Sequence, residues 1–360
     1  MTINLTPDPT LDDSPTMTRT ELRASGSLAS IFALRMLGLF LVLPVFALEA
    51  RKYPGGDDPA LIGLAMGIYG LTQGILQIPF GMASDRLGRK RVIIFGLLVF
   101  ALGSLIAGSA DTLTGLLVGR SVQGAGAVSA AVTALLADLT RDSVRTKAMA
   151  LVGASIGLMF ALSLVVSPVI AAHIGLSGLF VLTAVLALLG TAVVVWGVPT
   201  EPQAHKDAAR GGLRHVLSSP ALLRLNIGVF VLHAVQLAMW VAIPAFLVQA
   251  GLGKDDHWQI YLPAVLGSFV LMGGVFPLER RGYLRAVFLS AIALIALVQV
   301  ALLWVSSGAP SITCLAWLLF AFFCGFNVLE ATQPSLVSRI APASSRGAAM
   351  GVYNTLQSLG

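Results

Sequence analysis

The sequence predicts an all-α protein that crosses a membrane many times, as two six-helix bundles of which the second is truncated. The first observation is the composition, because 56% of the 360 residues are hydrophobic and 11% are charged, whereas soluble domains average about 25% charged residues. The mean hydropathy is +0.87. The second observation is a series of apolar runs long enough to span a bilayer, and the third is a sequence motif that recurs in both halves.

Apolar runs of about 20 residues, which cross a ~30 Å hydrocarbon core as helices, recur along the chain. Ten such runs are expected near 27–48, 60–82, 92–110, 113–137, 148–172, 178–198, 222–250, 259–278, 286–305 and 311–338. An eleventh run starts near residue 347. The polar stretch 1–26 is expected to be a disordered cytoplasmic tail, and the stretch 199–221 a cytoplasmic linker between the halves.

Basic residues set the expected orientation in the membrane. If the N-terminus lies in the cytoplasm, 18 of the 23 lysines and arginines fall in cytoplasmic segments and three in outside loops. Because basic residues favour cytoplasmic loops, we expect a multi-pass protein of the cell inner membrane with a cytoplasmic N-terminus. These loops also account for the net charge of +6, so the charge does not indicate nucleic-acid binding.

A repeated motif predicts two related halves. The segment that begins Arg145-Thr-Lys-Ala-Met-Ala returns as Arg346-Gly-Ala-Ala-Met-Gly. A duplicated six-helix unit with parallel repeats would produce such a recurrence of the motif. The first bundle is then expected over residues 27–198. The second is expected over 222–360, cut within helix 11, with part of that helix and all of helix 12 missing from this chain.

Several chemistries lack their usual sequence signals. Cys314 and Cys324 lie on one expected helix roughly 15 Å apart, too far for a disulfide. The sequence has no Cys/His cluster with metal-binding spacing and no phosphate-binding Gly-x-x-x-x-Gly-Lys-Ser/Thr motif. We therefore expect no metal, no cofactor and no enzymatic activity. The expected partners are a small-molecule substrate, protons and the lipid bilayer, and we expect a monomer.

The densest cluster of charge lies in the loop between the second and third expected spans. It reads Gly81-Met-Ala-Ser-Asp-Arg-Leu-Gly-Arg-Lys-Arg-Val92, and lipid cannot solvate such a cluster, so this loop is expected in water. The pattern resembles the G-x-x-x-D-R-x-G-R-[KR] loop of the major facilitator superfamily. The resemblance implies a conformational gate made of Gly81, Asp85, Arg86, Gly88, Arg89 and Asp138. We also expect Asp85 to face the N-terminal end of helix 11, where the helix dipole favours an anion.

The fourth expected span carries a buried cation. Arg120, Gln123 and Ala127 are expected to share one helical face. The stretch resembles the R-x-x-Q-G-x-G-A motif of the superfamily, whose arginine is linked to proton transfer in proton-coupled members. The alternative that the residues leave open is an arginine held in place by backbone carbonyls.

Glu330 is the one acid of 17 that lies deep in an expected span. Removal from water favours the protonated form of a carboxyl group, so we expect Glu330 to be the proton-coupling site, with Arg120 acting on it. His233 is the rival proton carrier, because histidine side chains titrate near neutral pH. The alternative is a Glu330 that is permanently paired with Arg35 or Arg120 and only holds helices together.

The segment around Phe326-Asn-Val-Leu-Glu330 and the motif at Arg346 resemble the YajR-type branch of the drug:proton antiporter group. In the superfamily, spans 1, 4, 7 and 10 line a central cavity. The resemblance therefore implies a substrate cavity. The expected lining residues are Arg35, Gln123, Gln236, Trp240 and Asn327.

The expected function is a proton-coupled secondary transporter, an efflux antiporter that exports a small, partly apolar molecule by alternating access. One alternative is an organic-anion transporter of the same fold, since Arg35 and Arg120 outnumber Glu330 in the membrane interior. Another is a membrane substrate sensor without net transport. Competition of transport by anionic rather than cationic compounds distinguishes the organic-anion transporter from the antiporter. A sensor would show no counterflow in proteoliposomes.

Overall fold

The computed structural model describes residues 16–201, 212–253, 256–306, 308 and 311–360, and over these residues it contains helices and no strand. Nine helical segments in the described part are long and apolar enough to cross a membrane. The prediction of an all-α polytopic protein is therefore confirmed. Residues 1–15 of the expected tail and 202–211 of the expected linker lie outside the described residues.

The first group of helices follows the expected spans, and three of them begin where a side chain caps free backbone amides. Thr18 forms a capping box with Glu21, and Asp58 and Thr112 cap the next starts. Helix α1 begins at Arg19, so the predicted tail is wrong over its last residues. The helices are α1 (Arg19–Ala50), α2 (Pro59–Leu87), α3 (Arg89–Gly108), α4 (Leu113–Ala125), α5 (Ser129–Asp138) and α6 (Asp142–Ala192).

Two glycines change the expected helix boundaries. The predicted fourth span is broken between α4 and α5, where Gly126 lies so close to α3 that an added Cβ would be 2.8 Å from the Phe100 Cβ. Ala127 lies in this break, so its predicted place on the helical face of Arg120 is wrong. The predicted fifth and sixth spans both lie in α6, which is interrupted between them at Gly175 (φ 67°) and ends in the π-helical turn η1 (Val193–Gly197).

The second group begins with a short helix inside the expected linker. Proline at the first turn of α8 and of α2 suits the preset backbone of a helix start. The elements are α7 (Gly212–Ser218), α8 (Pro220–Gln249), α9 (Trp258–Leu278), η4 (Glu279–Tyr283), α10 (Leu284–Ser306), α11 (Ile312–Ile340), η5 (Ala343–Ser345) and α12 (Arg346–Leu359).

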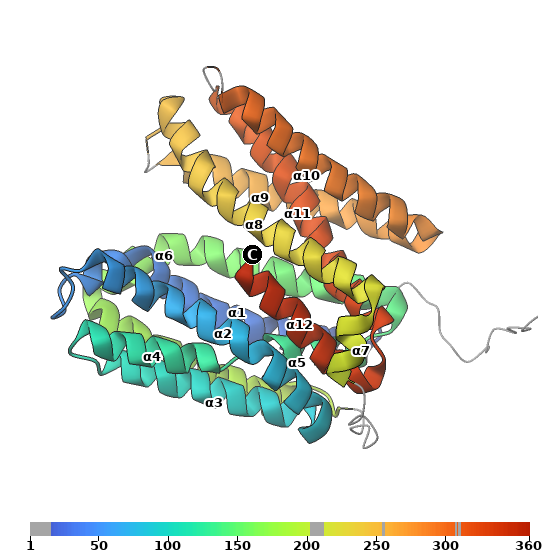
Figure 1. Cartoon of the computed structure of the whole chain (residues 1–360), viewed down its shortest axis with the longest axis horizontal. Coiled ribbons are helices and arrows are strands. Elements are labelled where there is room, and N and C mark those ends of the chain that lie inside the picture. The colour runs from blue at the N-terminus through green and yellow to red at the C-terminus, as the bar shows by residue number, and fades with distance from the viewer. Residues whose placement is uncertain (1–15, 202–211, 254–255, 307, 309–310) are drawn as a thin grey trace, which may run out of the picture.

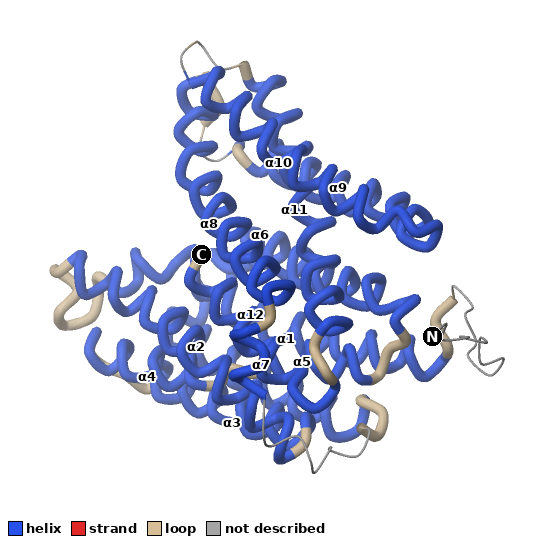
Figure 2. The backbone as a smooth tube through the Cα atoms, turned by 45° about the vertical axis from the view of Figure 1, so that its right-hand side comes forward, coloured by secondary structure: helices blue, strands red, loops and turns tan. Residues whose placement is uncertain are grey.

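Figure 1 shows helices α1–α6 as one group and α8–α11 as a second group, with α12 between them. Helix α12 packs against α2 and α5 of the first group and against α8 and α11 of the second. The groups lie together near α7 and separate toward the loop between α10 and α11, as the turned view in Figure 2 also shows. We call the end of the molecule near α7 the linker end.

An apolar cluster joins both groups at the linker end. It combines Ala130 and Ala134 of α5 with Leu222 of α8, Val337 of α11 and Met350 of α12, all of them buried. Separate apolar clusters fill the interior of each group. Burial across the seam stabilises the arrangement in which the groups touch at this end.

Candidate gate and proton site

Asp85, on α2, contacts the N-terminal end of α12, which belongs to the other half of the molecule. Its Oδ1 accepts the backbone N–H of Gly347 at 2.8 Å, and its Oδ2 accepts that of Ala348 at 2.8 Å. The first amides of a helix have no partner within the helix, and the dipole there favours an anion. The contact expected between Asp85 and the N-terminal end of this helix is therefore present.

Arg89 connects Asp85 to the end of α5. Its Nη1 donates to Asp85 Oδ1 at 2.5 Å and its Nε to Asp138 Oδ2 at 3.0 Å. Asp138 also pairs with Arg346 at the start of α12. We call Asp85, Arg89, Asp138, Arg346 and the amides of Gly347 and Ala348 the linker-end lock. It joins α2, α3, α5 and α12, and so ties the two halves together.

Glycines let α2 and α12 touch through their backbones. A Cβ on Gly347 would overlap the carbonyl oxygen of Gly81 and would lie 2.7 Å from Asp85 Oδ1, and a Cβ on Gly351 would lie 2.8 Å from the Gln77 carbonyl oxygen. Gly81 of the expected gate therefore lies in this contact. Sequence reasoning missed Gly347 and Gly351 as contacts, although both lie in the repeated motif.

Two residues of the expected gate have different positions. Arg86 is exposed and has no hydrogen bond or ion pair within the described residues, so it lies outside the lock. Gly88 has a φ of 98° and forms the turn between α2 and α3, a conformation that costs glycine little. Close by, Glu201 Oε2 accepts the Lys90 backbone N–H at 3.0 Å.

The repeated motif makes the same contact in both halves. Arg145 donates to the carbonyl of Ala137, and Arg346 donates to the carbonyl of Ser338, each eight residues earlier. Each arginine therefore binds the C-terminal end of the preceding helix and fixes the turn. Arg339 adds a second tie between the halves, from α11 to the Asp142 carbonyl of α6 at 2.8 Å.

Arg120 and Gln123 lie inside the first group of helices. Arg120 Nη1 donates to Gln123 Oε1 at 2.8 Å, and its other nitrogens point to the carbonyls of Ala65 and Met66 at 3.4 and 3.3 Å. Gln123 in turn donates to Ser104 at 2.8 Å. Arg120 is 1% exposed and Gln123 0%. Arg120 thus contacts both the glutamine and the backbone carbonyls that the sequence suggested as its partners. The side chains of Arg120 and Gln123 do not line an open cavity in this conformation.

Arg35 is also enclosed by the first group. It is 1% exposed, donates to Ser129 Oγ at 3.1 Å and to the Tyr69 hydroxyl at 2.8 Å, and lies over the Phe100 ring. These partners come from α5, α2 and α3. Arg35 therefore does not pair with Glu330 in this conformation.

We expect Arg120→Lys to lower the free energy of unfolding by about 2–4 kcal/mol. A lysine lacks the planar guanidinium group that bonds Gln123 and two carbonyls at once. Unfolding of the purified full-length protein in detergent measures this. The matched control is Arg23→Lys, because Arg23 also bridges two carbonyls but is exposed. Equal stability losses in the two variants would contradict a structural role for the buried arginine. Coupling should also suffer, with substrate binding partly retained.

Glu330 lies on α11 beside His233 of α8 and Gln357 of α12. Its Oε1 accepts Gln357 Nε2 at 2.8 Å, its Oε2 is 3.6 Å from His233 Nε2, and 26% of its side chain is exposed. His233 also packs edge-on against Phe326. The idea that Glu330 is permanently paired with Arg35 or Arg120 is therefore wrong for this conformation. Sequence reasoning missed Gln357, which no motif pointed out.

The remaining expected cavity residues are on α8 and α11. Asn327 donates to Ser268 of α9 at 2.7 Å, so it ties α11 to α9. Gln236 is half-buried on α8. The side chain of Trp240 lies outside the described residues.

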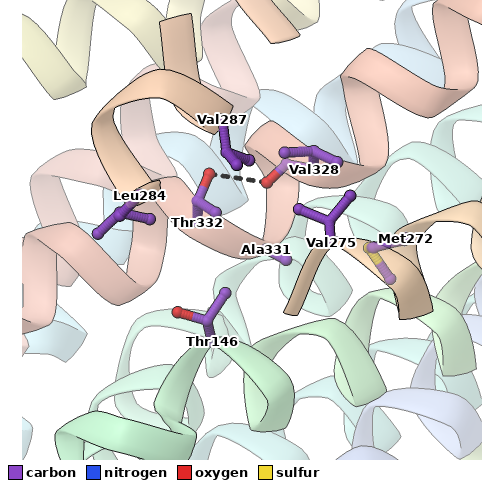
Figure 3. A pocket seen from close by; sticks show the side chains of 8 residues that line it. All are labelled: Thr146, Met272, Val275, Leu284, Val287, Val328, Ala331 and Thr332. Atoms are coloured by element: carbon purple, nitrogen blue, oxygen red, sulfur yellow. Dashed lines mark hydrogen bonds between the residues drawn. The ribbon is translucent and has the colours of Figure 1, made fainter. Parts of the chain in front are cut away.

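A small void lies toward the linker end of the same interface. Figure 3 shows Thr146 of α6 facing Ala331 and Thr332 of α11, with apolar side chains of α9 and α10 around them. Its volume is ≈ 10 Å³, about the space of one water molecule. A substrate cannot occupy it while the groups are together at this end.

These features define a class of protein: a membrane transporter built of two helical groups, with a charged lock between them. The major facilitator superfamily model matches residues 28–360, and the chain belongs to this superfamily. It is 43% identical to the inner membrane transport protein YajR of Escherichia coli over 96% of this chain and 76% of that protein. It is 34% identical to an uncharacterized transporter of Buchnera aphidicola, over 94% and 88% of the two chains.

Solved structures show the same fold at low sequence identity. The human organic anion transporter MFSD10 superposes with a TM-score of 0.80 at 18% identity, over 95% of this chain and 91% of that chain. The proton:xylose symporter XylE superposes with a TM-score of 0.73 at 14% identity, over 94% and 86%. By its superfamily and its likeness to YajR, the chain is a multi-pass membrane transport protein and not an enzyme.

Proposed function

We propose that this protein is a proton-driven antiporter that exports a small, partly apolar molecule by alternating access. The observation that carries the proposal is the position of Glu330, partly exposed between the halves and bonded to the helix that also forms the lock. In this proposal the linker end faces the cytoplasm, and the structure corresponds to the conformation that is closed on that side.

The partners of Glu330 support proton exchange. A carboxylate held by an arginine keeps its charge, whereas Glu330 is bonded to the neutral amide of Gln357 and lies near a histidine. Ionisable groups within membrane helices usually mark proton or substrate pathways. Glu330 is the main proton site in this proposal, and His233 is the second.

The lock supports alternation between two conformations. Transporters of this kind move one bundle against the other around a central site. Asp85 and Arg346 connect the halves only while the linker end is closed. Access to the cytoplasm then requires that these contacts break, and a substrate binding between the halves would shift that equilibrium.

We expect Glu330→Gln to abolish accumulation driven by a pH gradient while counterflow of the same compound persists. Glutamine keeps the size and hydrogen bonding of the side chain but cannot release a proton. Ethidium, a partly apolar cation, is the probe, and the protein is reconstituted full-length in proteoliposomes. The control is Glu49→Gln, because Glu49 has a similar exposure of 24% but is paired with Lys52.

If Glu330→Gln still concentrates ethidium with a pH difference, the proton site lies elsewhere and His233→Gln is the next variant. Absence of both accumulation and counterflow for the wild-type protein would favour the sensor.

An organic-anion transporter of the same fold is the second candidate. The observation that favours it is that Arg35 and Arg120 have no acidic partner among the described residues. Both are enclosed by the first helix group, however, so an anion would have to displace their neutral partners. Carboxyfluorescein in the same assay distinguishes the two, since transport of this anion without transport of ethidium supports the second candidate.

A further inference from the structure

We propose that Gln357 couples the protonation state of the His233–Glu330 pair to the position of α12, and thereby to the linker-end lock. This inference rests on the proposed function, because it takes Glu330 and His233 as the proton site. It adds a positioning residue to that site and a physical link between the site and the gate.

The amide of Gln357 joins the two titratable side chains. Its Nε2 lies 2.8 Å from Glu330 Oε1 and 3.0 Å from His233 Nε2. A primary amide has two N–H groups, so it can donate one to the carboxylate and one to the imidazole. The three side chains come from α11, α8 and α12, and the amide is therefore the point at which α12 is bonded to both neighbours.

A third contact determines which nitrogen of His233 carries the proton. His233 Nδ1 is 3.1 Å from the backbone carbonyl of Val229. A carbonyl only accepts hydrogen bonds, so Nδ1 is the donor. In a neutral imidazole Nε2 is then an acceptor, which is what the N–H group of Gln357 requires. The geometry fits a neutral His233, whose Nε2 accepts one N–H group of Gln357 while Glu330 Oε1 accepts the other.

A proton on His233 disrupts this arrangement. Nε2 would become a donor and would face the NH2 group of Gln357, which is also a donor. The protonated ring could instead pair with Glu330 Oε2, which lies 3.6 Å away and has no hydrogen bond within the described part of the chain. The amide must then turn or withdraw, and α12 loses its bond to His233 of α8.

A proton on Glu330 has a different effect. The carboxyl group would gain a donor, while the bond from Gln357 to His233 could remain.

The other nearby titratable group is Tyr353 of α12, which is buried and interacts electrostatically with Glu330. Toward α2, α12 is bonded through Thr355 Oγ1 to the Gly74 carbonyl at 2.7 Å.

Helix α12 connects the proton site to the lock. Gln357 lies near its C-terminal end, and Arg346 and Gly347 lie at its N-terminal end, where they contact Asp138 and Asp85. A rigid helix transmits a shift at one end to the other. Protonation of the pair should therefore weaken the lock and open the linker end.

The test measures the distance across the linker end as a function of pH. Spin labels are attached at Ser143 and Ala343, which are exposed and lie in different halves, in full-length protein in lipid nanodiscs. Both native cysteines are replaced beforehand. In the wild-type protein, acidification should increase the population with the longer distance.

In Gln357→Leu, the pH response should disappear, or its midpoint should move by at least about one pH unit. Gln357→Met is a second amide-free variant should the first fold poorly. The matched control is Thr355→Val, which removes a bond of α12 to α2 but leaves the proton site intact. It should change the closed fraction but keep a pH response.

Three results would overturn the inference. A wild-type midpoint and amplitude in both amide-free variants would do so, and so would loss of the pH response in Thr355→Val, because general loosening would then explain the effect. If Glu330→Gln abolishes the response while Gln357→Leu keeps it, only the role of Gln357 fails. If Glu330→Gln itself keeps the wild-type response, the assignment of Glu330 as the main proton site in the proposed function fails as well.

Discussion

Asp85→Asn should open the linker end in a large fraction of molecules. The variant keeps an oxygen that can accept hydrogen bonds, but it loses the charge that attracts Arg89 and the N-terminal end of α12. Hydrogen bonds to charged groups contribute about 1.5–3 kcal/mol. A loss of ~2 kcal/mol changes the ratio of closed to open molecules roughly 30-fold. Transport should be impaired while expression persists.

The spin-label distance between Ser143 and Ala343 measures this shift directly. The matched control is Asp142→Asn, which removes a carboxylate at the same end whose partner, Arg145, is in the same half. That variant should keep the wild-type distance distribution. Normal transport with an unchanged distance in Asp85→Asn would show that the lock does not stabilise the closed conformation. A lower yield instead of an opened gate would indicate that Asp85 only offsets basic charge during folding.

Gly347→Val should have a still larger effect on the closed conformation. Its Cβ would overlap the Gly81 carbonyl and crowd the Asp85 carboxylate, and backbone atoms packed this tightly cannot move aside without separating α2 from α12. We expect a protein that is folded in the membrane but open at the linker end, with transport reduced to background.

The control for this variant is Gly153→Val, the same substitution in the helix α6. A Cβ on Gly153 would meet nothing within 4 Å. Accessibility of a single cysteine at Ala134, which is buried in the apolar cluster that joins both groups, to a membrane-impermeant maleimide applied from the linker side reports the opening. If Gly347→Val and Gly153→Val label at the wild-type rate, the glycine contact is not needed for closure.

The spans could be predicted from local sequence, and the Asp85 contact from the motif around it. Long apolar runs leave few alternatives in a bilayer, and the charged loop next to Asp85 had to lie in water. The contact with α12 came from a resemblance to a family, and the repeat at Arg145 and Arg346 pointed to the same turn in both halves.

The parts that were missed depend on contacts between distant segments. The break at Gly126 arises from close packing against α3, which no property of its own segment indicates. The prediction that Arg120 and Gln123 share a helical face was correct. The sequence did not indicate that this face points into the first group of helices. Gln357 is one uncharged residue in an apolar run, and only the fold places it between His233 and Glu330.

The central claim is that protons drive alternation between two conformations, and it is tested most directly by measuring both ends of one protein. Labels at Ser143 and Ala343 report the linker end, and labels at Asp57 and Gln249, both exposed, report the opposite end. On acidification of the full-length protein in nanodiscs, the account predicts that the first distance increases while the second decreases, with one midpoint. Distances that change together, or that do not respond to pH at either end, would contradict it.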